Sequence, residues 1–296
     1  MINQIKAGEV IDRPANLIKE LIENAIDANA TVIDIHLVDG GLNLIHIKDN
    51  GIGMSERDLP LAFARHATSK IHRFEDLYGL SSYGFRGEAL ASIASVSRLT
   101  CTSYSARMNS GAKIVFNGEE IESCAPITRK ESGTEFFIKD LFFNTPARFK
   151  FVKSQIAEKK SLLRFINAFI LSNPQIRFSL RWDNKEKNIF NEVRPDQKER
   201  RIAKIWGIKD PNEIKKLEVE HEGYHIEGYI YPQKLAAQST KQYLFVNKRY
   251  VLDRSLHHTL QGFSSKYLQL KDTCAYCVYI TAPKSKIDVN VHPAKT

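Results

Sequence analysis

The sequence predicts an α+β protein built from two domains. Its 296 residues are enough for two hydrophobic cores, because single domains usually contain roughly 100–200 residues. A helix and several strand-like segments come first, and a second group of strands with a helix follows a polar stretch. This grouping, without a regular strand–helix alternation, favours α+β layers over a single Rossmann-type sheet.

The first expected element is a helix at residues 14–27. Pro14 suits its first turn, where a missing N–H costs nothing. Apolar residues recur at the helical spacing of three and four and form one stripe, which consists of Leu17, Ile18, Leu21, Ile22, Ala25 and Ile26. Strands are expected next at 31–38 and 44–48, joined by a turn at Asp39-Gly40-Gly41.

The remaining elements are expected on either side of a polar boundary. Residues 183–200 are polar and charged and include Pro195, which places the domains at 1–195 and 196–296. Before the boundary the sequence indicates strands at 99–103, 113–116 and 134–139 and a helix at 156–171. After it the sequence indicates a helix at 254–268 and strands at 223–231, 242–246, 275–280 and 287–291.

Composition is typical of a cytoplasmic protein. No apolar run approaches the roughly 20 residues of a membrane helix, and the N-terminus lacks the apolar core of a signal peptide. Four cysteines are too few for a disulfide framework in a chain of this length. Cys274 and Cys277 form a Cys-x-x-Cys without a second pair for zinc. Because residues three apart in a strand face opposite sides, two ordinary strand cysteines are favoured over a redox role.

The net charge of +9 favours polyanionic partners, because binding to phosphates releases condensed counterions. Much of the excess lies in two groups: Arg148, Lys150, Lys153, Lys159, Lys160 and Arg164, then Lys185, Lys187, Arg194, Lys198, Arg200, Arg201 and Lys204. For any single residue of these groups, a solvated helix face or loop is the favoured interpretation. Charge alone therefore does not establish nucleic-acid binding.

Three polar residues of the first helix share one face. Glu20, Asn24 and Asp27 are four and then three residues apart, so they line up away from the apolar stripe. They could form one wall of a polar pocket. An acidic triplet alone is more typical of a solvated helix face.

A second element strengthens the pocket hypothesis. The strand at 44–48 runs into Asp49-Asn50-Gly51-Ile52-Gly53, which places a carboxylate at a strand end before a glycine turn. Such a turn permits close approach of a ligand. An ionised carboxylate only accepts hydrogen bonds, so it suits an exocyclic amino group such as that of adenine. Gly-x-Gly alone is a weak signal, but its position after the Glu/Asn helix adds weight.

A third element is the glycine-flanked segment Tyr83–Ser92. Gly84 and Gly87 precede a helix rich in Ala, Leu and Ile, and helix N-termini present free N–H groups that favour phosphates. The chain contains neither a P-loop nor a strand-linked G-x-G-x-x-G. A nucleotide would therefore be bound by another architecture.

Together these motifs resemble the Bergerat ATP-binding fold, which is shared by gyrase-type topoisomerases, Hsp90 chaperones, histidine kinases and MutL. Five stretches occur in the order of the MutL family of DNA mismatch-repair proteins: 4–10, 64–71, 84–90, 140–148 and 291–295. They run from end to end of the chain. The resemblance implies a Bergerat-type α/β sandwich followed by a smaller domain like ribosomal S5 domain 2.

The resemblance also implies roles in ATP hydrolysis with Mg²⁺. Glu20 resembles the general base that activates water, and Asn24 resembles the residue whose oxygen holds Mg²⁺, with Asp27 in the same ATP site. Asp49 resembles the adenine reader, with Thr134 beside it. Thr134 is also consistent with an ordinary strand threonine.

Further residues resemble the parts of the site that surround the base and the phosphates. Gly51 and Gly53 resemble the turn under the base. The stretch 66–70 and the stretch 84–89 resemble the two ends of a phosphate-covering lid. The lid residues of the predicted ATP site are Thr68, Ser69, Lys70, Gly84, Phe85, Arg86, Gly87, Glu88 and Ala89. Lys295 resembles a catalytic lysine that reaches the γ-phosphate from the second domain, although a lysine there would otherwise be solvated.

The mechanism implied by the family is ATP binding that orders the lid, drives N-terminal dimerisation and creates a DNA-binding groove, with slow hydrolysis resetting the protein. Lys248, Arg249 and Arg254 are the candidate DNA contacts. The implied partners are double- and single-stranded DNA, a second copy of the chain, the mismatch sensor MutS, a helicase and a nuclease. Such a protein would be associated with the nucleoid, or with the nucleus in a eukaryote.

Three departures from the family bear on these expectations. Almost nothing precedes the first motif, where the family has a short dimerisation arm, and the chain ends at Thr296, as expected of a fragment without the C-terminal dimerisation domain. Asn29 replaces a common glycine, but asparagine tolerates left-handed backbone. The alternatives are a nucleotide-binding DNA scaffold without significant hydrolysis, or a chaperone or kinase. A histidine kinase is expected to carry an upstream phospho-acceptor helix dimer, for which the sequence leaves no room, and an Hsp90-like chaperone lacks a counterpart of residues 142–148.

Overall fold

The computed structural model describes residues 11–64, 89–150, 154–232, 241–267 and 274–283. The chain forms two compact units. Unit 1 takes its residues from Met1–Ile166 and Ile176–Glu192, and unit 2 takes its residues from Asn167–Gln175 and Val193–Thr296. In the described ranges, every helix falls short of the length and apolar character needed to cross a membrane.

Unit 1 is built on sheet A, an eight-stranded sheet with the order β5-β4-β3-β6-β2-β1-β7-β8. Neighbouring strands run antiparallel except for β1 and β7, which are parallel. The strands are β1 Val32–Val38, β2 Leu44–Asp49, β3 Arg98–Ser105, β4 Ser110–Asn117, β5 Glu120–Pro126, β6 Gly133–Lys139, β7 Arg177–Trp182 and β8 Asn188–Phe190.

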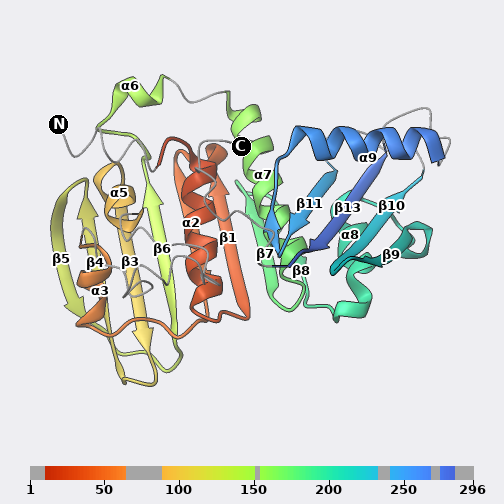
Figure 1. The fold of residues 1–296 in the computed structure, drawn as a ribbon. Coiled ribbons are helices and arrows are strands. Elements are labelled where there is room, and N and C mark those ends of the chain that lie inside the picture. The colour runs from red at the N-terminus through yellow and green to blue at the C-terminus, as the bar shows by residue number, and fades with distance from the viewer. Residues whose placement is uncertain (1–10, 65–88, 151–153, 233–240, 268–273, 284–296) are drawn as a thin grey trace. The chain divides into compact units, whose positions relative to one another are not determined.

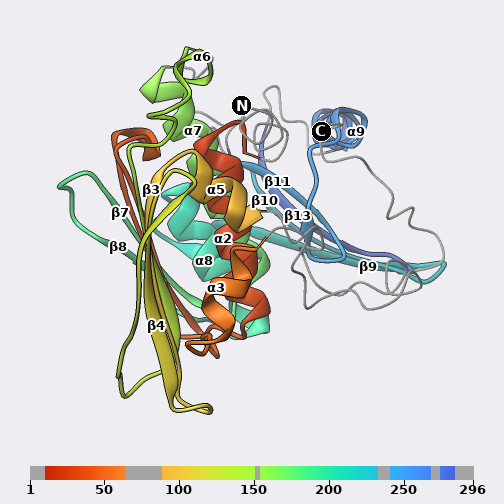
Figure 2. The same cartoon turned by 90° about the vertical axis from the view of Figure 1, so that its left-hand side faces the viewer.

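Helices cover one face of sheet A (Figure 1, Figure 2). They are α2 Pro14–Asp27, α3 Asp58–Ala62 and α5 Ala89–Ser95. The 3₁₀ turn η1 Asp39–Gly41 connects β1 to β2, as the Asp-Gly-Gly sequence predicted. After β6 come α6 Pro146–Phe149 and α7 Gln155–Ser172, and α7 begins in unit 1 and ends in unit 2. The predicted helices at 14–27 and 156–171 are confirmed.

The inner face of sheet A, which the helices cover, carries three rows of side chains. Directly opposite residues of β2, β6 and β3 share a face, so they stand side by side. The first two rows are Ile45, Ile138 and Leu99, and then Ile47, Phe136 and Cys101. In the third row Thr134 lies opposite Ser103, and the Thr134 N–H donates to the carboxylate of Asp49, which ends β2. The members of the first two rows are at most 5% exposed and belong to the core. The third row is polar and closes the core at one end of the sheet.

Unit 2 is built on sheet B, a five-stranded sheet with the order β12-β11-β13-β10-β9. Its neighbours are antiparallel except for β11 and β13. Its elements are η2 Pro195–Gln197, α8 Lys198–Trp206, η3 Pro211–Glu213, β9 Lys215–His221, β10 Tyr224–Tyr231, β11 Gln242–Val246, β12 Arg249–Tyr250, α9 Arg254–Tyr267 and β13 Ala275–Thr281. The strand predicted at 287–291 lies outside the described residues.

Two hydrophobic clusters pack on the two faces of sheet B. One joins α7 and α8 to the sheet and contains Trp206 and Cys277. The other contains Cys274 and packs against Leu260 of α9. The two cysteines of the Cys-x-x-Cys thus belong to opposite faces, as the strand periodicity predicted, and all four cysteines of the chain are free thiols.

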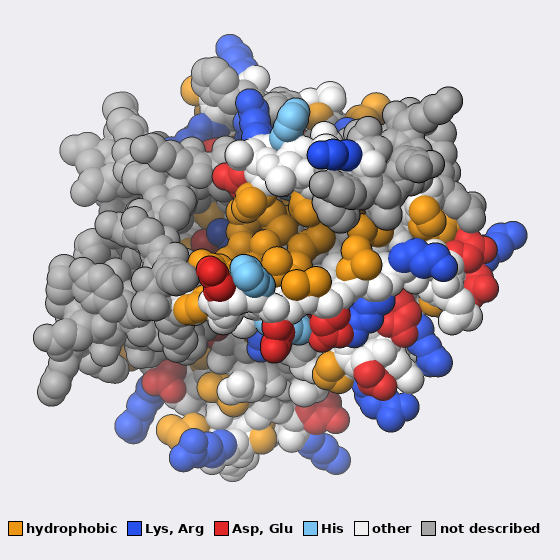
Figure 3. Space-filling view, turned by 45° about the vertical axis from the view of Figure 1, so that its right-hand side comes forward, with side chains coloured by type: hydrophobic (Ala, Val, Ile, Leu, Met, Phe, Trp, Pro, Cys, Tyr) orange, Lys and Arg blue, Asp and Glu red, His pale blue; other side chains and the backbone are white. Residues whose placement is uncertain are grey.

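The face of sheet B that α9 packs on is only partly covered. Leu217 and Val219 of β9 are 46% and 56% exposed, and Ile226 of β10, paired with Val219, is 38% exposed. Figure 3 shows apolar side chains gathered on this part of the surface, with charged residues around them. Helix α9 therefore buries only the central part of this face, around Leu244.

Candidate functional site

The candidate site begins at the end of α2. The chain leaves the helix through Asn29, whose φ is 58°, and the Ala30 N–H donates to the Ala25 carbonyl at 3.0 Å. This is the Schellman arrangement, in which the residue after the cap adopts left-handed backbone. The structure confirms that asparagine accepts this conformation here. It also explains why glycine is favoured at such a position.

The glycine turn after β2 packs directly on this helix end. The Ile52 N–H donates to the Ala28 carbonyl at 2.9 Å. At Gly51 a Cβ would lie 2.7 Å from the same carbonyl oxygen, so only glycine fits without a shift. The last turn of α2, which carries Asn24 and Asp27, therefore lies next to the Asp49–Gly53 segment. The structure brings together the helix and the Asp-x-Gly-x-Gly motif, as the sequence predicted.

Asn50 fixes the start of this turn to the first strand. Its Oδ1 accepts hydrogen bonds from the backbone N–H groups of Thr31 and Val32, both at 2.8 Å. Its Nδ2 donates to the Thr31 hydroxyl at 2.8 Å. Sequence reasoning assigned no role to Asn50, although asparagine commonly bonds nearby backbone in turns. Here these hydrogen bonds hold the turn against the start of β1.

Asp49 is a buried carboxylate at the end of β2, with 9% of its surface exposed. Its Oδ1 accepts from the backbone N–H groups of Gly51 at 2.8 Å and Thr134 at 3.4 Å. Among the described residues, no donor reaches Oδ2. Burial raises the pKa of Asp49 above its usual range, although the two backbone hydrogen bonds act in the opposite direction. The site therefore keeps one acceptor oxygen available in a desolvated place.

Ser103 completes the polar row beside Asp49 and Thr134. Its side chain is fully buried, and its Oγ accepts from the Met54 N–H and lies 2.8 Å from the Thr134 hydroxyl. Sequence reasoning missed Ser103. The available signal was the alternation of β3, where Leu99 and Cys101 point inward and a third inward position is polar.

The three polar residues of α2 lie on a partly buried face. Glu20, Asn24 and Asp27 are half-buried, whereas the neighbouring Glu23 is 5% exposed. Four residues of helix place Glu20 about 6 Å along the axis from Asn24. Within the described ranges, no group of three His, Cys, Asp or Glu side chains could hold a metal ion.

Several predicted site residues lie outside the described residues. These are Thr68, Ser69, Lys70, Gly84, Phe85, Arg86, Gly87, Glu88 and Lys295. Of the predicted lid, only Ala89 is described, and it is the first residue of α5. The lid and the lysine therefore stay predictions.

The DNA-contact candidates lie close together in the chain of unit 2. Lys248 and Arg249 are exposed at the turn between β11 and β12, where Lys248 has a φ of 68°. Arg254 is exposed at the first residue of α9. Their exposure is compatible with phosphate contact but does not test it.

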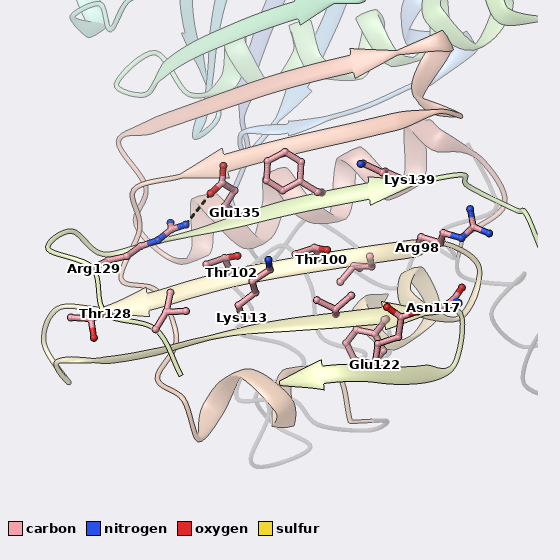
Figure 4. Close-up of a pocket in the computed structure, with 15 residues that line it drawn as sticks. Arg98, Thr100, Thr102, Lys113, Asn117, Glu122, Thr128, Arg129, Glu135 and Lys139 are labelled. Carbon is pink, nitrogen blue, oxygen red and sulfur yellow. Dashed lines mark hydrogen bonds and ion pairs between the residues drawn. The ribbon is translucent and has the colours of Figure 1, made fainter. Parts of the chain in front are cut away.

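A separate groove of about 640 Å³ lies on the outer face of sheet A (Figure 4). Residues Thr102 and Glu135 line it, and these alternate along their strands with Ser103 and Thr134 of the polar row. The groove and the polar row are therefore on opposite faces of the sheet. Within this groove Glu135 forms an ion pair with Arg129 at 3.2 Å. The residues that line the groove include both acidic and basic side chains.

Comparison with known proteins places both units. Residues 13–133 match the family described as histidine kinase-, DNA gyrase B-, and HSP90-like ATPase. Residues 202–296 match the DNA mismatch repair protein C-terminal domain. The MutL protein of Histophilus somni is 41% identical over 100% of this chain and 48% of its own length. The MutL protein of Vibrio vulnificus strain YJ016 is 40% identical over 100% of this chain and 45% of its own.

Solved structures agree in fold. The Aquifex aeolicus MutL ATPase domain complexed with ADP has a TM-score of 0.69 and 25% identity, covering 94% of this chain and 99% of that one. The N-terminal domain of a DNA repair protein has a TM-score of 0.79 and 24% identity, covering 99% and 90%. The predicted fold class, a Bergerat-type domain followed by one like S5 domain 2, is confirmed.

The fold and the arrangement of α2 with the glycine turn define a protein of the gyrase and histidine-kinase ATPase class. More closely, the chain belongs to the MutL family of DNA mismatch-repair proteins, as its end-to-end likeness to these relatives establishes. It spans about half the length of the curated relatives it matches.

Replacing Gly53 with alanine should disrupt the glycine turn. Its φ is +66° and an added Cβ would lie 1.9 Å from the Tyr104 carbonyl oxygen, which belongs to a strand. Gly118→Ala is the matched control, because Gly118 has a φ of +64° but the nearest atom to an added Cβ is the end of the Asn144 side chain, at 3.2 Å. We expect the control to lose about 1–2 kcal/mol from left-handed backbone alone. Gly53→Ala should lose roughly 2 kcal/mol more.

Urea unfolding followed by circular dichroism measures both losses. Equal losses for Gly53→Ala and Gly118→Ala would show that the carbonyl of Tyr104 does not confine the turn.

Proposed function

We propose that this chain binds ATP with Mg²⁺ and hydrolyses it as part of DNA mismatch repair. The observation that carries the proposal is the Asp49 carboxylate, buried beside the last turn of α2 with Oδ2 unused by the described residues. It is supported by membership of the MutL family and by the likeness to a MutL ATPase domain complexed with ADP.

In this proposal the polar row reads the adenine base. Asp49 Oδ2 accepts a hydrogen bond from the exocyclic amino group, and the Thr134 hydroxyl faces the neighbouring ring nitrogen. Gly51 and Gly53 form the turn under the base, and the carbonyl oxygens of Ala28 and Tyr104 leave no room for a Cβ at these two positions. A guanine oxygen opposite Asp49 would meet a second acceptor, so the site favours adenine.

The helix face supplies the groups near the phosphates. Glu20 acts as the general base that takes a proton from the attacking water. Asn24 offers a neutral amide oxygen, a ligand that suits Mg²⁺ when phosphate oxygens and waters complete the coordination. Bound there, the ion would neutralise phosphate charge. Asp27 lies at the same helix end, and the half-burial of all three side chains supports such a wall.

The larger cycle belongs to the same proposal. We assign ATP binding to the domain predicted at 1–195 and transduction to the domain predicted at 196–296, with Lys295 reaching the γ-phosphate. ATP binding orders the lid formed by 66–70 and 84–89, drives N-terminal dimerisation and opens a basic path for DNA. Hydrolysis resets the protein. The wider partners are MutS, a helicase and a nuclease, in the cytoplasm at the nucleoid.

Removing the proposed base should separate binding from hydrolysis. Glu20→Ala should lower phosphate release by about a hundredfold or more, because no other group is assigned to activate the water. Affinity for ADP should change little. Glu186→Ala, which removes an exposed carboxylate elsewhere in unit 1, is the control and should keep the wild-type rate. Equal rates for wild type and Glu20→Ala would discard the enzyme assignment and favour a nucleotide-binding scaffold on DNA.

Nucleotide affinity should depend on the ionisation of Asp49. Because burial raises its pKa, affinity for ADP should fall as the pH drops through this raised pKa, where the acceptor becomes protonated. The raised pKa of Asp49 affects folding stability in the opposite direction from nucleotide affinity. An acid with a raised folded-state pKa opposes folding when ionised, so protonating Asp49 alone stabilises the fold. Falling affinity with retained stability is therefore the expected signature.

Calorimetric titration with ADP from about pH 7 to about pH 4.5 measures this dependence. Asp49→Asn, which cannot ionise, should bind weakly at every pH. The carboxylates of Asp34, Glu135 and Glu227 have lowered pKa values, so their contribution to stability is lost only at lower pH. A wild-type affinity that stays constant across the range would contradict recognition by an ionised Asp49.

DNA binding should weaken with salt and depend on the basic residues of unit 2. Lys248→Ala and Arg254→Ala should each reduce the slope of log affinity against log salt by about 1, because each removes one phosphate contact. Lys209→Ala, which removes another exposed lysine of unit 2, should leave the slope unchanged. Fluorescence anisotropy with a labelled duplex gives the slopes, and identical slopes for all three variants would reassign the DNA contacts.

A further inference from the structure

The polar row contains one residue that no ATP-site motif includes. Ser103 is 0% exposed, so its hydroxyl is buried inside unit 1. It lies in the polar row with Thr134 and Asp49, beside the row that contains Cys101. Burying a hydroxyl costs free energy unless it is hydrogen-bonded, and Ser103 has three candidate partners. These are the Met54 N–H at 2.8 Å, the Thr134 hydroxyl at 2.8 Å and the Gly133 carbonyl at 3.3 Å.

The donors and acceptors in this network can be assigned. A hydroxyl has one hydrogen to donate and two lone pairs to accept with. The Met54 N–H can only donate, so it occupies one lone pair of Ser103 Oγ. The Ser103 hydrogen then goes to Thr134 Oγ1 or to the Gly133 carbonyl. If the Ser103 hydrogen went to the Gly133 carbonyl, Thr134 would donate to Ser103, and the 2.8 Å contact would be kept in either case. That arrangement leaves the Ser103 hydrogen on a 3.3 Å contact, which is longer than the about 2.5–3.0 Å usual between a hydroxyl and an oxygen. We therefore adopt the arrangement in which Ser103 donates to Thr134.

This assignment fixes the direction of the Thr134 hydroxyl. Once Thr134 Oγ1 accepts from Ser103, its own hydrogen must point elsewhere. Among the described residues, Thr134 Oγ1 has no other hydrogen-bond partner, and its neighbour on the other side in the row is Asp49. The row then presents a donor at Thr134 beside an acceptor at Asp49. Adenine carries the complement, a ring-nitrogen acceptor beside an amino donor.

We infer that Ser103 is a positioning residue that makes Thr134 a hydrogen-bond donor to ring nitrogen N1 of adenine, directly or through one water. The inference rests on the proposed function, because it assumes that the polar row faces the base. Ser103 itself touches no nucleotide in this scheme. It acts through Thr134 and, by accepting from Met54, holds the turn that carries Gly53.

The test compares ADP with 1-deaza-ADP, in which a C–H replaces ring N1. Wild type should prefer ADP by roughly three- to tenfold, the range expected for one hydrogen bond. Ser103→Ala should lower this preference, because the Thr134 hydroxyl is then free to rotate and is no longer held with its hydrogen toward the base. Ser103→Cys, which keeps the side-chain size but hydrogen-bonds weakly, should behave in the same way and serves if the alanine variant does not fold.

Two further variants separate orientation of Thr134 from loosening of the turn. Ser110 Oγ accepts from the Glu56 N–H at 3.1 Å, so Ser110→Ala removes a serine that caps the same loop without contacting Thr134. It should keep the wild-type preference. Thr134→Val should lose the preference, and adding Ser103→Ala to it should cause no further change, because the two residues act in sequence.

The outcomes distinguish the inference from the function on which it rests. A wild type that binds neither nucleotide would contradict the proposed function. A wild type that binds ADP and 1-deaza-ADP equally, or a Ser103→Ala variant that keeps the full preference, would overturn the role of Ser103 while leaving ATP binding intact. Thermal unfolding of each variant confirms that the affinities refer to folded protein.

Discussion

The buried carboxylate of Asp49 sets the geometry of everything around it. Its Oδ1 accepts two backbone N–H groups, so the chain after β2 must turn tightly enough to bring Gly51 back over it. That turn runs against the end of α2, where the Ala28 carbonyl leaves no room for a Cβ at Gly51. On the other side, a Cβ at Gly133 would lie 2.2 Å from the Asp49 carbonyl oxygen. The glycines of this region follow from the close approach of three chain segments.

Sheet A supports this arrangement through the regular spacing of its central strands. Rows of apolar residues from β2, β6 and β3 form the core, and the next row in the same direction is polar. A single register therefore fixes both the packing of the core and the alignment of Asp49, Thr134 and Ser103. A shift by one residue would move all three to the outer face, where the mixed-charge groove lies.

Much of the fold could be predicted because local patterns and tertiary packing agree. Pro14 and the apolar stripe defined α2, and alternating apolar residues defined β10, β11 and β13. The motifs also predicted that Asp49 lies beside the Asn24 end of the helix. The roles of Glu20 and Lys295 stay predictions, because they depend on a ligand and on residues outside the described ranges.

Other elements could not be predicted, for identifiable reasons. Strands β5 and β9 are edge strands with every residue exposed. In β9, Leu217 and Val219 alternate with charged residues, but two apolar residues in so charged a segment are a weak strand signal. Helix α8 begins inside the charged stretch that was interpreted as a domain boundary. The charged residues around Lys198 masked the apolar side of this helix, which includes the buried Trp206. Ser103 escaped notice because one serine in a strand is unremarkable until its cross-strand neighbours are known.

The rows of sheet A have one more consequence. The polar row lies next to the row that contains Phe136 and Ile47. The residues at the base of the proposed pocket therefore border the hydrophobic core directly. A ligand that binds there in the folded protein, and does not bind the unfolded chain, raises the melting temperature by mass action. Conversely, a cavity created by truncating Phe136 would loosen the polar row beside it and so weaken nucleotide binding in the proposed site. Ligand binding and folding therefore depend on the same side chains, and a measurement of either binding affinity or stability reports on both.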